Sequence, residues 1–261
     1  MKRYLANRLA FYQFEGLSDY ADLYHGVFTR AGGVSRAPFE SLNLSRTVGD
    51  DLEAVRENNR RMLAVFDVAP EQATTAWLVH GRAVAVLTSA DAGGYRSGVD
   101  AIITRARGLA LTMRFADCVP ILFHDPARRT IGIAHAGWRG VAENVIAATV
   151  SALGEQFGSQ PRDLWAGIGP CISADRYRVG PEVITQVAAA CPPHTPIVQS
   201  QPDGSVHLDL NAAVTAQLRA CGVAHIEDAR LCTASRTDEW FSHRAENGKT
   251  GRFGVVLGLR A

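Results

Sequence analysis

Three short segments of the 261-residue chain each place a side chain that can bind a metal at the end of an apolar run, beside small residues. These segments are residues 77–81, 114–120 and 133–140, and the side chains are His80, Cys118 and His135. Two imidazoles and one thiolate form a ligand set of the kind that catalytic zinc uses, with a fourth position open. The separations of 38 and 17 residues are unlike those of a zinc finger, so the fold itself must assemble such a site.

The same residues also permit a second chemistry. The Cys118 thiolate could act as a nucleophile while the His135 imidazole serves as its base. Asp117 precedes the cysteine, and on a strand its side chain points to the opposite face, where an ion pair or a contact behind the site is expected rather than catalysis. A single His or Cys at a strand end is often merely structural, so the residues alone leave these alternatives open.

Three other segments have the composition of anion sites. Residues 135–140 lie where a strand becomes a helix, and Arg139 adds a guanidinium to the free N–H groups expected there. The glycine turn after Arg30 and the Ser-Leu-Asn-Leu run at 41–44 repeat this pattern. Residues 232–252 collect hydroxyls and arginines around two aromatic side chains, which could stack a base or bind phosphate. Ordinary turns and polar loops would explain all three equally well.

The composition excludes several classes of protein. With 27 basic and 26 acidic residues the net charge is +1, so the basic excess of a nucleic-acid-binding protein is missing. Five cysteines, an odd number without a C-x-x-C pair, predict no disulfide framework. The most apolar stretch, 145–153, is too short for a membrane span, and the first 20 residues lack the apolar core of a signal peptide. We therefore expect a cytoplasmic protein that acts on small molecules, with no nucleic-acid or membrane partner.

Hydrophobic periodicity predicts alternating strands and helices. Expected strands are 23–29, 74–79, 83–88, 100–104, 109–115, 121–124, 130–134, 164–168 and 253–259, and expected helices are 51–68, 139–157, 181–190 and 210–221. Several strands follow one another in the middle of the chain before any helix, which argues against a repeating βαβ fold. The order favours a mixed-sheet sandwich with helices on the outside.

Taken together, these segments resemble the YfiH family, whose members were once labelled laccase-domain proteins or polyphenol oxidases and are now described as purine nucleoside phosphorylases. The pair Ala-Asp-Cys-Val-Pro and His-Ala-Gly-Trp-Arg-Gly, with the histidine 17 positions after the cysteine, is highly specific for it. The matching segments are 28–35, 41–44, 48–50, 79–81, 99–104, 116–120, 135–140, 169–172 and 250–252.

The resemblance implies an α/β fold, an α/β/β/α sandwich in a single domain over residues 1–261, with Zn²⁺ bound by His80, Cys118 and His135, which would also be catalytic. It implies phosphate-dependent cleavage of adenosine, inosine and S-methyl-5'-thioadenosine, together with deamination of adenosine. The matching positions that would contact nucleoside or phosphate are Arg30, Gly33, Ser35, Asn43, Arg139, Cys171, Arg244 and Arg252.

Two features limit the resemblance. The family usually has glutamine two residues before the first histidine, where this chain has Leu78, which bears on efficiency or substrate preference more than on metal binding. The older laccase label fits poorly, because eight histidines without a His-x-His pair cannot build a four-copper site. Cu²⁺ could still occupy the His-Cys-His group. A copper-dependent polyphenol oxidoreductase and a Cys/His hydrolase of amides are the alternative functions.

Overall fold

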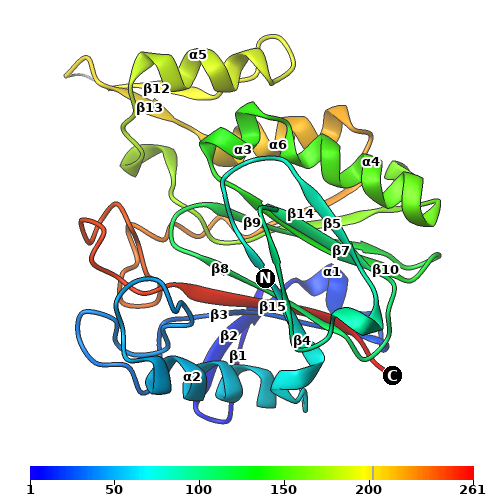
Figure 1. Ribbon diagram of the computed structural model, residues 1–261. Helices are drawn as coiled ribbons and strands as arrows, with labels where there is room; N and C mark the ends of the chain where they lie inside the picture. Colours follow the sequence, from blue (N-terminus) through cyan, green and yellow to red (C-terminus); the bar gives the residue numbers. More distant parts are fainter. Residues whose placement is uncertain (202) are drawn as a thin grey trace.

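Two β-sheets face each other in the computed structural model, which describes residues 1–201 and 203–261 (Figure 1). The first sheet has the order β1 (Lys2–Ala6), β2 (Leu9–Gln13), β3 (Leu23–Phe28), β15 (Phe253–Leu259), β8 (Ala110–Phe115), β4 (Ala73–Trp77) and β6 (Tyr95–Ser97). The second has the order β14 (His225–Asp228), β11 (Trp165–Ile168), β9 (Val119–Asp125), β10 (Thr130–Ala136), β7 (Ala101–Thr104) and β5 (Val84–Leu87). Both sheets contain parallel and antiparallel pairs.

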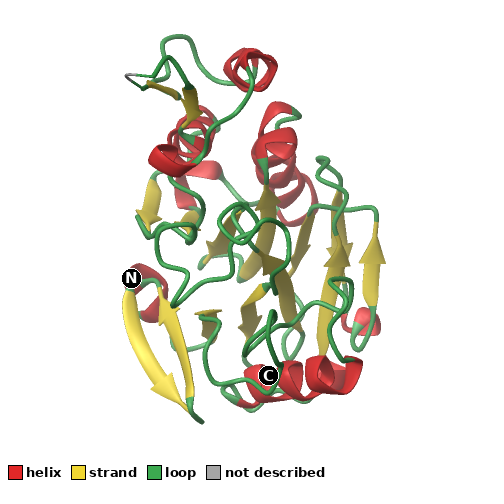
Figure 2. Ribbon diagram, turned by 90° about the vertical axis from the view of Figure 1, so that its left-hand side faces the viewer, coloured by secondary structure: helices red, strands yellow, loops and turns green. Residues whose placement is uncertain are grey.

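Longer helices lie outside the two sheets, as the turned view shows (Figure 2), whereas the short helix at residues 15–18 contacts a strand of each sheet. The helices are α1 (Glu15–Ser18), α2 (Leu52–Ala64), α3 (Trp138–Ala142), α4 (Val145–Phe157), α5 (Pro181–Ala189) and α6 (Leu210–Ala220). Helix α2 lies on the first sheet, whereas α3, α4 and α6 lie on the second (Figure 1). A small hairpin of β12 (Val198–Ser200) and β13 (Val206–Leu208) lies beside α5. The predicted α/β/β/α sandwich is thereby confirmed.

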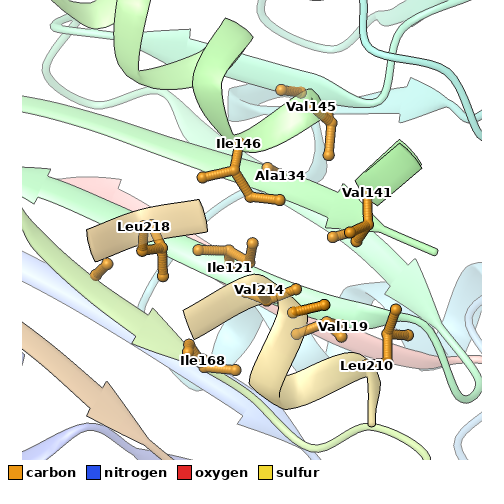
Figure 3. Packing of buried hydrophobic residues seen from close by; sticks show 14 of the residues in the cluster. Val119, Ile121, Ala134, Val141, Val145, Ile146, Ile168, Leu210, Val214 and Leu218 are labelled. Atoms are coloured by element: carbon orange, nitrogen blue, oxygen red, sulfur yellow. The ribbon is translucent and has the colours of Figure 1, made fainter. Parts of the chain in front are cut away.

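The layers are held by three apolar clusters. The cluster between the sheets includes Leu111, Met113 and Phe115 of β8, and the cluster under α2 includes Ala110 of the same strand. The third cluster packs α3, α4 and α6 onto the second sheet through residues such as Val119, Ile121, Ala134, Val141, Val145, Ile146, Ile168, Leu210, Val214 and Leu218 (Figure 3). Strands β9 and β10 are buried along their whole length because they are covered on both faces.

The predicted helix at 139–157 is wrong as a single helix. It is interrupted after α3, where Asn144 adopts a left-handed backbone with φ of 62° before α4 begins at Val145. Periodicity did not reveal this break because apolar residues continue through it. Strands β1 and β2 were not predicted, and the single-domain assignment stays a prediction. No helix in the described ranges is both long and apolar enough to cross a membrane.

Candidate metal centre and substrate cavity

The fold brings the three predicted ligands together at one end of the sandwich. His80 follows β4 of the first sheet, Cys118 directly precedes β9, and His135 lies near the end of β10 in the second sheet. The ligand atoms of the three side chains all lie within 4.8 Å of one another. His80 is exposed, Cys118 is half-buried and His135 is buried, so the group has one side against the core and one side open.

Asp100 fixes the positions of two of these ligands. Its carboxylate accepts hydrogen bonds from the backbone N–H groups of Val79, His80 and Gly81 at 2.8–3.1 Å. The same carboxylate lies 3.0 Å from His135 Nδ1. Because a carboxylate only accepts, Nδ1 must carry the proton, which leaves Nε2 of His135 free to bind a metal.

The backbone near the ligands is unusually constrained. His80 has φ of 62°, a left-handed conformation that costs free energy for a residue with a side chain. The three hydrogen bonds to Asp100 compensate for this cost. A Cβ atom at Gly137 would lie 2.9 Å from Cys118 Sγ and 3.3 Å from His80 Cδ2, so only glycine leaves room for the group.

Electrostatics favour a thiolate at this site. Burial raises the pKa of the Cys118 thiol, but the charge and hydrogen bond of His135 and the hydrogen bond of His80 outweigh burial and lower the pKa to about 6. Burial conversely lowers the pKa of His135, whereas Cys118 and Asp100 raise it to about 9. One thiolate and two imidazoles suit zinc or copper, so the donor set fits a bound metal ion.

Asp117 lies behind the group and makes no ion pair with a described residue. Its carboxylate accepts hydrogen bonds from the hydroxyls of Thr233 and Ser242 and from the backbone N–H of Arg244, all at 2.7 Å. With φ of 86°, Asp117 turns the chain between β8 and β9 and presents Cys118 to the cavity. It therefore connects the 232–244 segment to the metal centre.

The metal centre opens into a cavity of about 570 Å³, which we call the metal-side cavity. Of the predicted substrate residues, Arg139, Arg244 and Arg252 line it. Arg139 is exposed and lies over the Trp138 ring at 4.4 Å, and Arg244 is exposed and lies over the Tyr177 ring at 5.0 Å. The helix after Gly137 is only five residues long, so its dipole adds little to these side chains.

The remaining predicted residues lie outside the described lining of this cavity. Arg30 is engaged elsewhere, because its guanidinium donates to Glu40 O, Thr237 O and Glu246 Oε1 at 2.8–2.9 Å and lies over the Phe241 ring. Cys171 is buried opposite Cys232 and lines a separate cavity beneath α6. We therefore leave Arg30 and Cys171 out of the substrate site proposed below.

Gly33, Ser35 and Asn43 form a network that supports the site from behind. Ser35 Oγ and Asn43 Nδ2 both donate to Asp50 Oδ2, at 2.6 and 2.8 Å. Asn43 Oδ1 accepts from the backbone N–H of Arg252 at 2.9 Å. At Gly33 a Cβ would lie 2.1 Å from the carbonyl oxygen of Ser41. These residues hold the 41–47 loop against Arg252, the residue that precedes β15.

Sequence reasoning missed several residues of the cavity. Trp77, Arg114 and Tyr177 line it, together with Ser45 and Thr47. The position of Arg114 could have been predicted from the strand pattern. It lies between the apolar residues Met113 and Phe115, so its side chain points away from the face of the strand that they bury. The role of Asp100 had no such signal, because its partners come from two distant segments.

Comparison with known proteins agrees with this geometry. Residues 24–260 match the family model described as multi-copper polyphenol oxidoreductase laccase. Purine nucleoside phosphorylase YlmD of Geobacillus stearothermophilus is 36% identical over 256 residues, which cover 94% of this chain and 93% of that protein. Purine nucleoside phosphorylase PA4543 of Pseudomonas aeruginosa is 37% identical over 236 residues, which cover 90% and 92%.

Solved structures show the same fold. The crystal structure of YlmD from Geobacillus stearothermophilus has a TM-score of 0.91 at 34% identity and covers 96% of this chain and 99% of that one. A Bacillus licheniformis protein named YfiH also has a TM-score of 0.91, at 29% identity, with coverage of 97% and 96%. The chain belongs to the laccase-like YfiH family.

The multi-copper description of the family model does not match the ligands present. Within residues 1–201 and 203–261, His80, Cys118 and His135 are the one group of three or more His, Cys, Asp or Glu side chains placed to hold a metal ion. A multi-copper oxidase needs several such groups. The geometry therefore supports a single-metal centre.

Proposed function

We propose that this protein is a zinc-dependent purine nucleoside phosphorylase. The observation that carries the proposal is the His80–Cys118–His135 group at the base of a cavity lined by arginines, in a chain whose relatives, matched over nine-tenths of its length, are named purine nucleoside phosphorylases. The substrates would be adenosine, inosine and S-methyl-5'-thioadenosine, each with phosphate. The products would be the free purine and ribose 1-phosphate, or 5-methylthioribose 1-phosphate when the substrate is S-methyl-5'-thioadenosine.

Two groups of residues in the cavity would have different roles: one would bind the metal ion and the other would bind phosphate. His80, Cys118 and His135 would hold the ion, and Asp100 keeps the proton of His135 on Nδ1. When bound, zinc supplies a Lewis acid to the reaction. The arginines stabilise the phosphate, whose oxygen attacks C1′ while the C1′–N9 bond breaks and the purine leaves. A cation-like ribosyl group develops in this step, and the bound phosphate offsets its charge.

We also propose a deaminase activity at the same centre, as the family resemblance implies. Adenosine and water would give inosine and ammonia, with the metal again as the Lewis acid. The nucleoside would then have to present C6 of the purine to the metal centre instead of C1′ of the ribose. The two reactions therefore require two binding orientations in the metal-side cavity.

The test is an assay of purified protein with adenosine, with and without phosphate, after metal analysis. Adenine that forms only with phosphate supports phosphorolysis, and inosine without phosphate supports deamination. Cys118→Ala should lose zinc and turnover together. Cys191→Ala, which removes a half-buried thiol just after the end of α5, should retain both. Full activity in metal-free Cys118→Ala would overturn the proposal.

A second candidate is a hydrolase that uses the Cys118 thiolate with His135 as base. The close contact and mutual charge stabilisation of these two groups favour it. Such an enzyme would form a covalent thioester adduct at Cys118 and would keep its activity after chelation of the metal. Mass spectrometry of the chelated protein after incubation with an amide substrate distinguishes it from the phosphorylase.

A further inference from the structure

Arg114 is a half-buried arginine for which the described residues supply no ion pair. It lies on β8 and faces outward from the sandwich, beside β4, in a half-buried position. Its guanidinium makes one hydrogen bond, Nη2 to the carbonyl oxygen of Ala76 at 3.0 Å. No carboxylate of a described residue pairs with it. Arg114 lines the metal-side cavity, and its nitrogens are not among the described buried atoms that lack a hydrogen-bond partner. A guanidinium has five N–H donors, so those that make no hydrogen bond within the protein are open to a ligand, and an anion suits them best.

A second arginine lies close to the first. Arg46 stands on the 41–47 loop, and its positive charge adds to the effect of burial in lowering the pKa of Arg114. Arg46 is exposed and likewise lacks an ion pair with any described residue. Two neighbouring like charges repel each other. A protein that keeps both without a carboxylate between them is arranged for a ligand that brings negative charge.

Arg114 lies where two cavities meet, and Arg46 lines one of them. Beyond the metal-side cavity, a second cavity of about 340 Å³ lies on the outer face of β4 and β8. Thr47, Trp77 and Arg114 line both. A ligand held at Arg114 could therefore reach from the outer cavity into the cavity of the metal centre. The Thr47 hydroxyl, which is 3.0 Å from Ser45 Oγ, adds a further polar group at this junction.

The other arginines of the metal-side cavity are less suited to hold an anion. Arg139 and Arg244 are exposed and lie over aromatic rings. Arg252 donates to the carbonyl oxygens of Thr250 and Gly251. A charge-assisted hydrogen bond is stronger where water is partly excluded, which favours half-buried Arg114 over the exposed pair.

We propose that Arg46 and Arg114, with the Thr47 hydroxyl, form a binding subsite for a phosphate-type oxyanion at the junction of the two cavities. The inference deepens the proposed phosphorolysis, on which its catalytic meaning rests, by assigning the position of the phosphate. Inorganic phosphate and the phosphate ester of a nucleotide share the chemistry that these groups recognise. The subsite itself does not depend on which of the two supplies the oxyanion.

Equilibrium dialysis with radiolabelled inorganic phosphate alone, and separately with adenosine 5′-monophosphate alone, tests the subsite without relying on turnover. Arg114→Met and Arg46→Met should each weaken binding about 10- to 100-fold, as expected for the loss of charge-assisted hydrogen bonds. Arg129→Met is the matched control, because its guanidinium lies on the surface and only approaches Asp22 at 3.8 Å. The double variant should lose less than the product of the single losses, since both arginines hold one ligand.

The outcomes distinguish inorganic phosphate from a phosphate ester as the bound oxyanion. They also test the subsite independently of the proposed phosphorylase activity. Loss of phosphate binding assigns inorganic phosphate to the subsite, and loss of nucleotide binding alone assigns a phosphate ester; both support it. Unchanged binding of both ligands in the two variants overturns it.

If the wild-type protein performs phosphorolysis, Arg114→Met should raise the KM for phosphate about 10-fold or more and leave the KM for adenosine nearly unchanged. If it performs none, the binding result still stands. Because Arg46 is exposed, its variant keeps the test valid if Arg114→Met folds poorly.

Discussion

The carboxylate of Asp100 controls the metal centre at the scale of single residues. It holds three consecutive backbone N–H groups and His135 Nδ1. Burial raises the pKa of Asp100, but these hydrogen bonds outweigh burial and lower it. A carboxylate that orients a metal-binding histidine contributes to metal affinity without touching the metal.

Replacing Asp100 with Asn should therefore weaken zinc binding by about 10- to 100-fold, the range found for residues that orient metal ligands. An amide has one acceptor oxygen, so one of its N–H groups would face a donor. Competition with a chromogenic chelator measures the affinity. Asp228→Asn is the control, since Asp228 also accepts from a side-chain amide and a backbone N–H, but far from the metal centre. Equal zinc affinity in Asp100→Asn and wild type would contradict the assigned role.

A second prediction concerns Gly137 and depends only on the lack of room for a side chain beside Cys118. Its backbone is extended, with φ of −78° and ψ of 171°, so alanine is acceptable to the backbone, yet its Cβ would press on Cys118 Sγ. Gly137→Ala should yield folded protein with reduced zinc content. In Gly81→Ala, by contrast, the Cβ would meet nothing closer than 3.7 Å, and zinc content should remain near that of the wild type. Circular dichroism with metal analysis checks both variants.

The residues of the site differ in how far sequence could predict them. His80, Cys118 and His135 were predictable because their residue types and apolar flanks suit a metal site wherever they meet. The roles of Arg30 and Arg114 were not predictable, because they differ only in whether a carboxylate pairs with the guanidinium in the folded protein. Arg30 is paired with Glu246, a contact across 216 positions of the chain, whereas Arg114 lacks a described carboxylate. Residue type alone cannot distinguish a structural arginine from one available to a ligand.

At the scale of elements, sequence predicted the central strands well. Strands β9 and β10 are strongly apolar because they are covered on both faces, and β8 alternates buried with half-buried residues in its second half. The edge strand β1 has a mixture of exposed and half-buried residues, so its pattern resembled that of a loop. Strand β6 is fully exposed and gave no signal. Prediction from periodicity succeeds where the layers bury an element and fails at the edges.

The interruption between α3 and α4 leads to an element-level prediction. Asn144 adopts a left-handed backbone, and its carbonyl oxygen accepts from Ala148 to start α4. Its side chain makes only a long contact of 3.4 Å with Gln217, which has two other partners. Asn144→Ala should lower the free energy of unfolding by about 1 kcal/mol, since alanine tolerates this conformation less well than asparagine. Asn144→Gly should lower it by less, because glycine has no Cβ to clash.

Urea unfolding of the two variants and the wild type checks this prediction. The order of stability should place the glycine variant above the alanine variant. Because glycine is the poorer helix former by about 1 kcal/mol, a continuous helix through position 144 would give the reverse order. The comparison therefore tests the break between α3 and α4 directly.

At the scale of the whole molecule, buried histidines link stability to pH. His25 lies on β3 in the interior, where its Nε2 accepts the backbone N–H of Phe14 at 2.8 Å and its Nδ1 has no partner among the described residues. Burial lowers the pKa of His25 to about 4, and the Glu227 charge opposes this only in part. The folded protein therefore keeps His25 neutral at pH values where the unfolded chain protonates it.

The sign of the effect follows from proton binding. Above about pH 6.5, the usual pKa of histidine, His25 is neutral in both states and has no pH-dependent effect. Between about pH 6.5 and pH 4 the unfolded state binds a proton that the folded state does not, so stability falls as the pH falls. The loss from His25 amounts to about 3 kcal/mol by pH 4. Burial also lowers the pKa of His124, which adds to the fall in the same direction.

His25→Gln isolates this contribution, because the glutamine oxygen can still accept the Phe14 N–H but does not titrate. Urea unfolding at pH 7, 6, 5 and 4 should show a steep loss of stability in the wild type and a shallower loss in the variant. His124 remains in the variant, so some dependence on pH persists. An equal loss of stability in both proteins between pH 7 and pH 4 would contradict the prediction. His25 would then take up a proton in the folded state, which means that water reaches its ring despite the packing of Phe14 against it.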